Sequence, residues 1–290
     1  MKILELTKKI ADKLSSVYDS EISQMYAWWI LEEICEKKRA HLLAEKDFKL
    51  TESQEKKLKI WLEKLIQENM PLQYLIGYVN FCGVKILVRP PVLIPRPETE
   101  EIVLNLIEKL KPCKDKKLKV LDLCTGSGCI VIALSKAFPS FDFVATDISE
   151  AALYLAQENA ELNELGNIEF VNSDVYENLP VDQRFDLIIS NPPYIDPLVW
   201  DDLDLSVTEW EDEAALIAEN HGLAIIERIV VGAKYYLQSG ECFKGVPKIV
   251  LEIGFDQGPI LKKLLESAGF VDVDIEKDLA GKDRSAVARL

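Results

Sequence analysis

The fold of this chain is decided by the segment FDLIISNPPYI at residues 185–195. Phe185–Ser190 is predicted to be a buried β-strand, and Asn191 follows it directly. The two prolines after Asn191 fix two φ angles and remove two backbone donors, so the strand ends at a rigid turn. Tyr194 then adds a flat ring and a hydroxyl. An amide, exposed carbonyls and an aromatic plate at a strand end suit the binding of a planar NH2-bearing group.

A plain tight turn is the competing interpretation of the same residues. Asn-Pro is a common turn dipeptide and would by itself favour that interpretation. The second proline, the tyrosine and the apolar strand before them favour a functional turn instead.

Composition places the chain among globular proteins of one large or two ordinary domains, since it has 290 residues. It contains no apolar run of the ~18–20 residues needed for a membrane span, and its charged N-terminus does not fit a signal peptide. The six cysteines form no CxxC pair and are expected to be reduced thiols in a cytosolic protein. The two histidines, His41 and His221, are far apart, which argues against a zinc site or a histidine-based triad.

Charge is distributed unevenly along the chain. Residues 1–70 hold 13 basic and 13 acidic residues, so the formal net charge of −15 belongs to the remainder. Residues 196–219 contain nine acidic residues and no Lys or Arg. Such a segment repels nucleic-acid phosphate but not a basic protein or a neutral small substrate. A solvated surface loop is an equally good explanation of this run.

The first 68 residues are predicted to be helical, with three apolar stripes at helical spacing. The first stripe is Leu6, Ile10, Leu14 and Val17; the second is Met25, Trp28, Trp29, Ile30, Leu31 and Ile34; and the third is Leu58, Trp61, Leu62, Leu65 and Ile66. Thr51–Gln54 fits a capping box at the start of the third stripe. We expect a small helical bundle with the tryptophans in its core, serving for substrate docking or packing.

A hairpin and an arm follow the bundle. Residues 78–81 and 84–88 are predicted to pair as a β-hairpin across a Cys82-Gly83 turn. The arm LIPRPETE at residues 93–100 is stiffened by two prolines, and a helix is predicted from about Glu98 to Leu110. The residues leave two interpretations open: a rigid linker, or an arm that places Arg96, Glu98 and Thr99 over a site.

From residue 118 onward, strands alternate with helices, which predicts a doubly wound, mostly parallel sheet. The expected strands are 118–123, 141–146, 168–171, 185–190 and 248–253, with closing strands at 271–276 and 285–290; the expected helices are 129–138, 150–162 and 224–237. Ser149 is placed to cap the second of these helices.

Three features follow successive strands of this sheet, where α/β folds bind ligands. Gly126 and Gly128 allow a ligand to approach the backbone closely, but they do not continue as G-x-G-x-x-G, which disfavours a dinucleotide. Asp147 is placed to bind ribose hydroxyls, and Asp174-Val175 is placed beside an adenine ring. Together they indicate an adenosine-containing cofactor without phosphates, hence S-adenosylmethionine.

These motifs resemble those of the HemK/PrmC family, which methylates the glutamine of the Gly-Gly-Gln motif in peptide-chain release factors. The resemblance covers nearly all of residues 70–290 and rests on LIPRPETE at 93–100, DLCTGSG at 122–128, ATDIS at 145–149, SNPPYI at 190–195, EIG at 252–254 and GKDR at 281–284. NPPY alone is shared with methyltransferases of DNA adenine, and the combination with the RPETE arm points to glutamine.

The chain departs from this family in three places. Cys124 stands where glycine is usual, which raises the question of whether this loop residue can adopt the needed backbone angles. Glu209-Trp210 stands for a usual Glu-Pro pair, and residues 218–222 replace a glycine-rich segment. These changes concern the shape of the loops more than the activity.

The resemblance implies an α/β, S-adenosylmethionine-dependent class I methyltransferase sheet of Rossmann type. Together with the helical bundle and the hairpin predicted from the residues, this gives three expected parts: an N-terminal helical substrate-docking domain at 1–70, a β-hairpin linker at 71–95 and a catalytic domain at 96–290. The expected cofactor-binding residues are Cys124, Thr125, Gly126, Ser127, Gly128, Asp147, Asp174, Val175 and Asn191. The expected catalytic residues are Asn191, Pro192 and Tyr194, and the expected substrate-binding residues are Asn191, Pro192, Pro193 and Tyr194.

The predicted mechanism is one of positioning. The Asn191 side-chain oxygen and the Pro192 carbonyl accept the two hydrogens of the substrate NH2, while Tyr194 packs against the amide plane. No metal is expected. The expected partners are class 1 release factors, with no nucleic acid and no membrane, and the expected enzyme is a cytoplasmic monomer.

Three other functions compete with this prediction. A DNA adenine methyltransferase would need a basic groove, against which the acidic run argues. A nicotinamide oxidoreductase is disfavoured by the glycine spacing. A non-catalytic adaptor would be expected to lack Asn191 or Asp147.

Overall fold

Two units make up the chain. The computed structural model describes residues 2–238 and 246–290. The first unit ends at Gly77 and also takes in Asp204–Trp210, and the second holds Tyr78–Leu203 and the residues from Glu211 onward. Cys242 lies outside the described residues.

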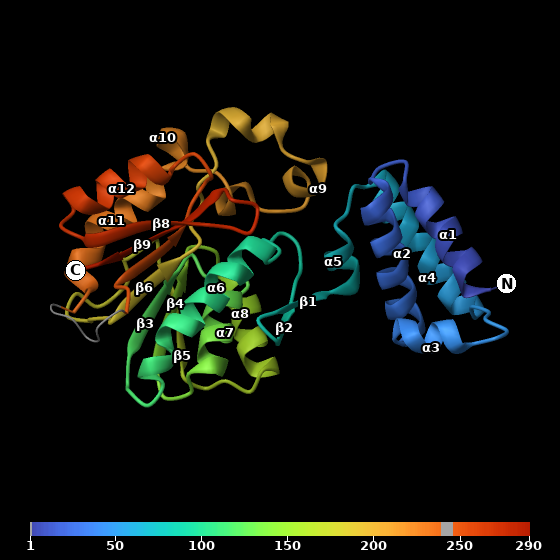
Figure 1. Ribbon diagram of the computed structural model, residues 1–290, viewed down its shortest axis with the longest axis horizontal. Coiled ribbons are helices and arrows are strands. Elements are labelled where there is room, and N and C mark those ends of the chain that lie inside the picture. Colours follow the sequence, from blue (N-terminus) through green and yellow to red (C-terminus); the bar gives the residue numbers. More distant parts are fainter. Residues whose placement is uncertain (1, 239–245) are drawn as a thin grey trace. The chain divides into compact units, whose positions relative to one another are not determined.

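The first unit is a helical bundle, as predicted (Figure 1). Its helices are α1 (Ile3–Leu14), α2 (Ser20–Cys35), α3 (Arg39–Ala44), α4 (Glu52–Gln67), α5 (Leu72–Ile76) and α9 (Leu205–Thr208). Thr51 starts α4 through the predicted capping box, in which its hydroxyl accepts from the Gln54 amide and the Gln54 side chain accepts from the Thr51 amide. Trp28 and Trp61 are buried in the bundle core, as expected.

Three residues of the predicted stripes do not join this core. Val17 lies beyond the end of α1 and is 42% exposed. Met25 and Trp29 are 41% and 39% exposed. Trp29 lies one residue, and thus about 100°, past the buried Trp28, so it points away from the core and stacks on Tyr26 at 5.8 Å between ring centroids. The prediction that every tryptophan is a core anchor was wrong for Trp29.

The hairpin and the helix after the arm have the predicted form. Strands β1 (Tyr78–Phe81) and β2 (Val84–Leu87) pair antiparallel, and both residues of the connecting turn have positive φ, Cys82 at 47° and Gly83 at 80°. Helix α6 (Pro97–Leu110) starts with proline at its first turn, where the missing amide hydrogen leaves no bond unmade.

A seven-stranded sheet forms the centre of the second unit, in the order β5-β4-β3-β6-β7-β9-β8. The strands are β3 (Lys119–Leu123), β4 (Asp142–Asp147), β5 (Ile168–Asn172), β6 (Leu187–Ser190), β7 (Ile249–Glu252), β8 (Val271–Lys277) and β9 (Asp283–Arg289). The first five in this order are parallel, and β9 pairs antiparallel with both β7 and β8. The predicted doubly wound, mostly parallel sheet is confirmed.

Helices cover both faces of this sheet (Figure 1). Helices α6, α7 (Cys129–Ala137) and α8 (Glu150–Leu162) lie together on one side, while α11 (Ala224–Tyr236) and α12 (Gly258–Ser267) pack on the other. The remaining short helices are η1 (Lys111–Cys113), η2 (Pro197–Asp202), η3 (Glu213–Ala215) and α10 (Glu219–Gly222). The sequence analysis missed α12, although Leu261 and Leu265 follow helical spacing and are fully buried.

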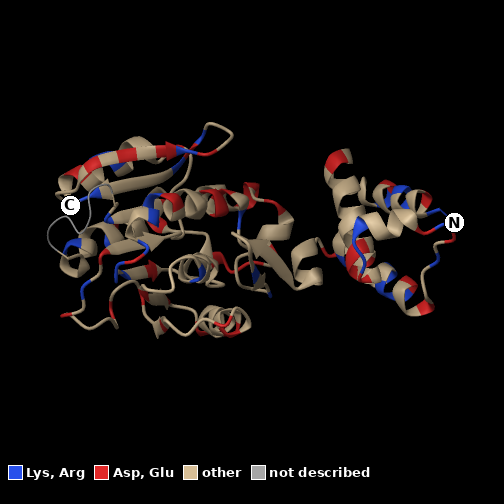
Figure 2. Cartoon of the chain, turned by 60° about the horizontal axis from the view of Figure 1, so that its bottom comes forward, with Lys and Arg blue, Asp and Glu red and all other residues tan. Residues whose placement is uncertain are grey.

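Side chains of both charge signs are interspersed along the helices of residues 1–70, which hold equal numbers of basic and acidic residues (Figure 2). Among the helices that the structure describes, none is long and apolar enough to cross a membrane.

Candidate active site

The carboxyl ends of β4, β3 and β6 meet at one edge of the sheet. Leu123, at the end of β3, lies in register with Thr146 of β4 and with Ser190 of β6. The strands are parallel, so the segments that follow them emerge side by side. The glycine loop, Asp147 and Asn191 therefore come together although the chain separates them by about 20 to 70 residues.

A cavity of about 400 Å³ opens at this edge, within the second unit. This volume is typical of small-molecule sites. Seven of the predicted site residues line it: Cys124, Gly126, Asp147, Asp174, Val175, Asn191 and Pro193. The five others do not appear in its lining: Thr125, Ser127, Gly128, Pro192 and Tyr194.

The glycine loop is built from residues with left-handed backbone angles. Gly126 has a φ of 56° and Gly128 a φ of 79°, and Cys124 adopts the same region at 58°. The non-glycine residue at 124 therefore does take the required backbone angles, at a cost of roughly 1–2 kcal/mol. Burial raises the pKa of its thiol, so the side chain lines the cavity as a neutral group.

The loop residues that miss the cavity support it from behind. Thr125 and Ser127 are buried, and the Thr125 hydroxyl donates to Asp122 Oδ2 at 2.6 Å. Gly128 starts α7 and lies against α8, since an added Cβ would meet the Cβ of Ala156 at 3.0 Å. This position needs glycine both for its φ and for its packing.

Asp122 is a buried carboxyl group beneath this loop. Its Oδ1 atom has no hydrogen-bond partner among the described residues. Burial raises the pKa of Asp122 to about 7, a shift that the Thr125 hydroxyl opposes and the nearby Asp147 reinforces. A titratable group of this kind behind a cavity is typical of functional sites.

Asp147 lies at the end of β4 with its carboxylate held in place by the backbone. Its Oδ2 accepts from the Gly126 amide at 2.8 Å, and its Oδ1 accepts from the Ser149 amide at 2.9 Å. Burial raises the pKa of Asp147, and these two hydrogen bonds oppose the shift. Ser149 caps α8 as predicted, accepting from the Ala152 amide at 3.3 Å.

Asp174 and Val175 also line the cavity. Val175 has a φ of 55°, which is unusual for a β-branched residue. Asp174 forms an ion pair with Arg228 of α11 at 2.9 Å. The sequence analysis missed Arg228, which lines the cavity, because no motif marks it and its helix follows some 50 residues later.

The NPPY turn is held from two sides. The Asn191 Nδ2 donates to Thr99 Oγ1 at 3.2 Å, and the Tyr194 hydroxyl donates to Glu252 Oε1 at 3.1 Å. Behind the turn, Gln257 Nε2 donates to the Tyr194 carbonyl at 2.9 Å. Burial raises the pKa of Tyr194, so its hydroxyl stays protonated and serves as a donor.

The segment at the start of the LIPRPETE arm forms part of the cavity lining. Pro91, Val92 and Leu93 line it, while Thr99 of α6 contacts Asn191. Of the three candidate residues of the arm, Thr99 is therefore joined to the site through Asn191, whereas Arg96 and Glu98 do not appear in the lining of the cavity.

A buried carboxylate missed by the sequence analysis anchors this arm. Glu211 forms an ion pair with Arg96 and accepts from the Ile94 amide at 3.1 Å. Its side chain is 1% exposed, and the neighbouring Asp212 amide donates to the Pro91 carbonyl at 2.8 Å. The Glu209-Trp210 pair belongs instead to the first unit, where Trp210 Nε1 donates to the Glu68 carbonyl at 2.8 Å.

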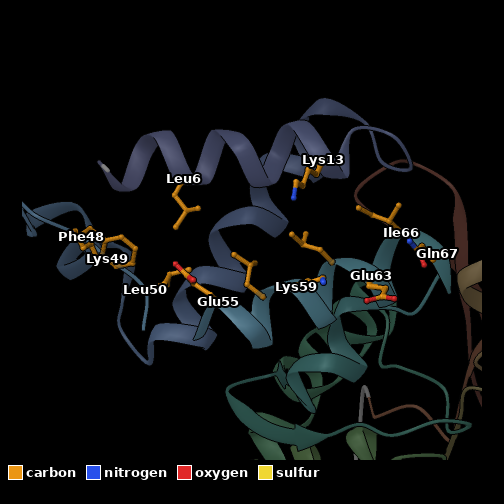
Figure 3. A pocket seen from close by; sticks show the side chains of 12 residues that line it. Leu6, Lys13, Phe48, Lys49, Leu50, Glu55, Lys59, Glu63, Ile66 and Gln67 are labelled. Atoms are coloured by element: carbon orange, nitrogen blue, oxygen red, sulfur yellow. The ribbon is translucent and has the colours of Figure 1, made fainter. Parts of the chain in front are cut away.

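A second hollow lies within the first unit, between α1 and α4 (Figure 3). It encloses about 760 Å³, and Leu6 of α1 points into it toward α4. Its floor is apolar and its rim carries both lysines and glutamates: Lys13, Lys49, Lys59, Glu55 and Glu63. Among the described residues that line it, none is a buried polar group of the kind that fixes a ligand's orientation, so the cavity at the sheet edge is the candidate active site.

Comparisons with known proteins match both units. Residues 5–77 match the PrmC N-terminal domain, and residues 100–205 match the methyltransferase small domain. The first of these matches extends the resemblance to residues before 70, which the motifs did not cover.

Whole-chain relatives share one name, release factor glutamine methyltransferase. The relative from Lactococcus lactis is 38% identical over 97% of this chain and 97% of its own length. The relative from Coxiella burnetii is 35% identical over 100% of this chain and 99% of its own length.

Solved structures show the same fold at low sequence identity. The hMettl16 catalytic domain is 18% identical, with a TM-score of 0.55, and the match covers 84% of this chain and 83% of that one. A methyltransferase from Pyrococcus furiosus is 16% identical, with a TM-score of 0.50, and the match covers 81% of this chain and 96% of that one.

Proposed function

The chain belongs to the release factor glutamine methyltransferase family, and we propose that it methylates the side-chain amide of the glutamine in the Gly-Gly-Gln motif of class 1 release factors. The methyl donor is S-adenosylmethionine. The observation that carries the proposal is the position of Asn191, whose side chain lines the cavity while its amide nitrogen is already bonded to Thr99. Its oxygen is therefore the end available to a substrate NH2 group.

The cavity suits an adenosine-containing methyl donor. Asp147 offers a carboxylate for ribose hydroxyls, and the positive-φ loop lets a ligand approach its backbone closely. Ile148 and Val175 line the cavity with apolar surface suited to an adenine ring. When bound, S-adenosylmethionine supplies an electrophilic methyl group.

The residues of the chain contribute orientation rather than base chemistry. An amide nitrogen is a poor nucleophile because its lone pair is delocalised. The Asn191 Oδ1 and the Pro192 carbonyl accept the two amide hydrogens of the glutamine, which fixes the direction of the nitrogen lone pair. Tyr194 packs against the amide plane. Orientation of this kind supplies much of the rate, and the proton can leave to solvent after transfer.

The remaining roles follow from this activity. We assign the substrate-binding role to Asn191, Pro192, Pro193 and Tyr194, and the cofactor-binding role to Cys124, Thr125, Gly126, Ser127, Gly128, Asp147, Asp174, Val175 and Asn191. Thr125, Ser127 and Gly128 serve by shaping the loop. We also propose that the enzyme is a cytoplasmic monomer. Its substrate is a protein rather than nucleic acid, in keeping with residues 196–219, which carry nine acidic and no basic residues.

Methyl transfer from labelled cofactor to a purified release factor tests the proposal. We expect labelling of the wild-type release factor and none after a Gln→Asn change in its Gly-Gly-Gln motif. Asn191→Ala is expected to lower turnover by about 100-fold, because the orientation of the nitrogen is lost. Labelling of DNA in place of the release factor, or near-normal turnover by a folded Asn191→Ala variant, would contradict it.

A further inference from the structure

A chain of hydrogen bonds runs from Asn191 to a buried glutamate, Glu252, to which the sequence analysis gave no role although it is the first residue of EIG at 252–254. Asn191 Nδ2 donates to Thr99 Oγ1 at 3.2 Å, and Thr99 Oγ1 donates to Glu252 Oε2 at 2.7 Å. The other oxygen of the same carboxylate accepts from the Tyr194 hydroxyl at 3.1 Å. Glu252 ends β7 and is 2% exposed, so both of its oxygens are committed to this network.

The direction of every bond in this chain is set by the carboxylate. An ionised carboxylate only accepts, so the single hydroxyl hydrogen of Thr99 must point to Glu252. The Thr99 oxygen can then only accept from Asn191. That leaves the nitrogen of the Asn191 amide facing Thr99 and its oxygen facing away. An NH2 group entering the cavity meets an acceptor rather than another donor.

We propose that Glu252 is a positioning residue for methyl transfer: through Thr99 it fixes the Asn191 amide with its oxygen toward the substrate, and it polarises that oxygen as an acceptor. This inference rests on the proposed function. The substrate nitrogen becomes more positive as it is methylated, and a hydrogen-bond chain that ends in a buried anion strengthens the acceptor at its far end. A purely structural role would not require a charge here, because burying a carboxylate is costly.

The surroundings of Glu252 allow this charge to change near neutral pH. Burial raises the pKa of Glu252 to about 6, while hydrogen bonds from Thr99 and Tyr194 and the charge of Arg284 oppose the shift. The titratable and charged groups that face it are Glu98 of α6, Cys129 of α7, Tyr194 of the turn and Arg284 of β9. A protonated Glu252 can donate to Thr99, and Thr99 then no longer has to accept from Asn191.

Steady-state kinetics with a release factor as substrate test the inference on four variants. Glu252→Gln keeps the size of the side chain and removes its charge, whereas Thr99→Val removes the connecting hydroxyl and Thr99→Ser restores it. Glu266→Gln, an exposed residue of α12, is the matched control for loss of a carboxylate. Equilibrium binding of S-adenosylmethionine and thermal unfolding are measured on each variant.

We expect Glu252→Gln and Thr99→Val to lower kcat by roughly 10- to 100-fold, by analogy with the loss of residues that orient metal ligands in metalloenzymes. Their Kd for the cofactor should stay within about 2-fold of wild type, since less than 0.5 kcal/mol of binding is involved. Thr99→Ser and Glu266→Gln should retain most activity. The ratio of wild-type to Glu252→Gln kcat should rise from pH 5 to pH 7, because the wild-type carboxyl ionises across that range.

The outcomes separate this inference from the function on which it rests. A wild-type protein that methylates no release factor would refute both. A wild-type protein that is active, together with a folded Glu252→Gln variant of equal kcat or a ratio independent of pH, would refute the positioning role alone. If Glu252→Gln does not fold, the Thr99→Val and Thr99→Ser pair decides, and equal turnover in that pair overturns the inference.

Discussion

Gly222 offers a sharp test of how the NPPY turn is held. It follows Asn220 and His221, and all three residues have positive φ, at 57°, 55° and 79°. A Cβ added at Gly222 would lie 2.0 Å from the Tyr194 carbonyl oxygen and 2.9 Å from Gln257 Nε2. The atoms that it would strike are those that fix the backbone of the turn.

Three costs of Gly222→Ala can be worked from these contacts. An L-residue in the left-handed region costs roughly 1–2 kcal/mol. Overpacking against backbone costs a further ~1–3 kcal/mol, and displacing the Gln257 hydrogen bond costs about 1 kcal/mol. The sum is a destabilisation of roughly 3–6 kcal/mol. A shift of about 1 Å in the turn that carries Asn191 should lower kcat by ~100-fold.

Gly83→Ala is the matched control. Gly83 also lies in the second unit and has a φ of 80°, but an added Cβ would meet nothing within 4 Å. It should therefore cost only the backbone term of roughly 1–2 kcal/mol and leave kcat unchanged. The difference between the two variants isolates the contact with Tyr194.

Scanning calorimetry and methyl-transfer kinetics measure both effects. Unfolding of the second unit is identified as the transition that S-adenosylmethionine shifts to higher temperature. Gly222→Ala should lower that transition well below that of Gly83→Ala. Equal transition temperatures in the two variants, with equal kcat, would show that Gly222 does not hold the turn and would refute the reasoning.

Three further predictions concern charged groups. Asp147→Ala should raise the Kd for S-adenosylmethionine by roughly 10- to 100-fold, because it removes a carboxylate that also holds the glycine loop. Glu150→Gln, at an exposed position, is the control and should leave this Kd unchanged. Titration calorimetry measures both, and an unchanged Kd for Asp147→Ala would contradict the prediction. Arg96→Ala should destabilise the second unit by about 2–4 kcal/mol, since it leaves the buried Glu211 carboxylate without its ion-pair partner. Adding Glu211→Gln should recover most of this stability, as measured by denaturant unfolding. If the double variant recovers none of it, the loss does not come from the ion pair. The pKa of Asp122 is raised to about 7 from an ordinary 3.8. The neutral Asp122 carboxyl therefore stabilises the fold fully below pH ~3.8, and this stabilisation is lost as the pH rises through ~7. The free energy of unfolding of Asp122→Asn should thus increase relative to wild type over that pH range, and a difference that does not change with pH would disprove the raised pKa.

Local sequence predicted most of the secondary structure and part of the site. Strands and helices followed from apolar spacing, and the Thr51 capping box and the Ser149 cap followed from residue type, because these are short-range interactions. The left-handed angles at Gly126 and Gly128 were signalled by glycine itself. Parallel strands in a doubly wound sheet also place their following loops at one edge, so Asp147 and Asn191 could be expected to meet.

Only the tertiary structure brought in Glu211, Arg228 and Glu252. Glu252 was quoted only as part of EIG, with no role, and Glu211 and Arg228 were marked by no motif; the importance of each comes from burial and from a partner about 50 to 153 residues away. No local pattern records such a pairing, because the free energy depends on both groups losing water at the same point. The sequence by itself determined that an amide stands at the end of β6, through Asn191, while the network from Glu252 through Thr99 decided which end of that amide faces the cavity.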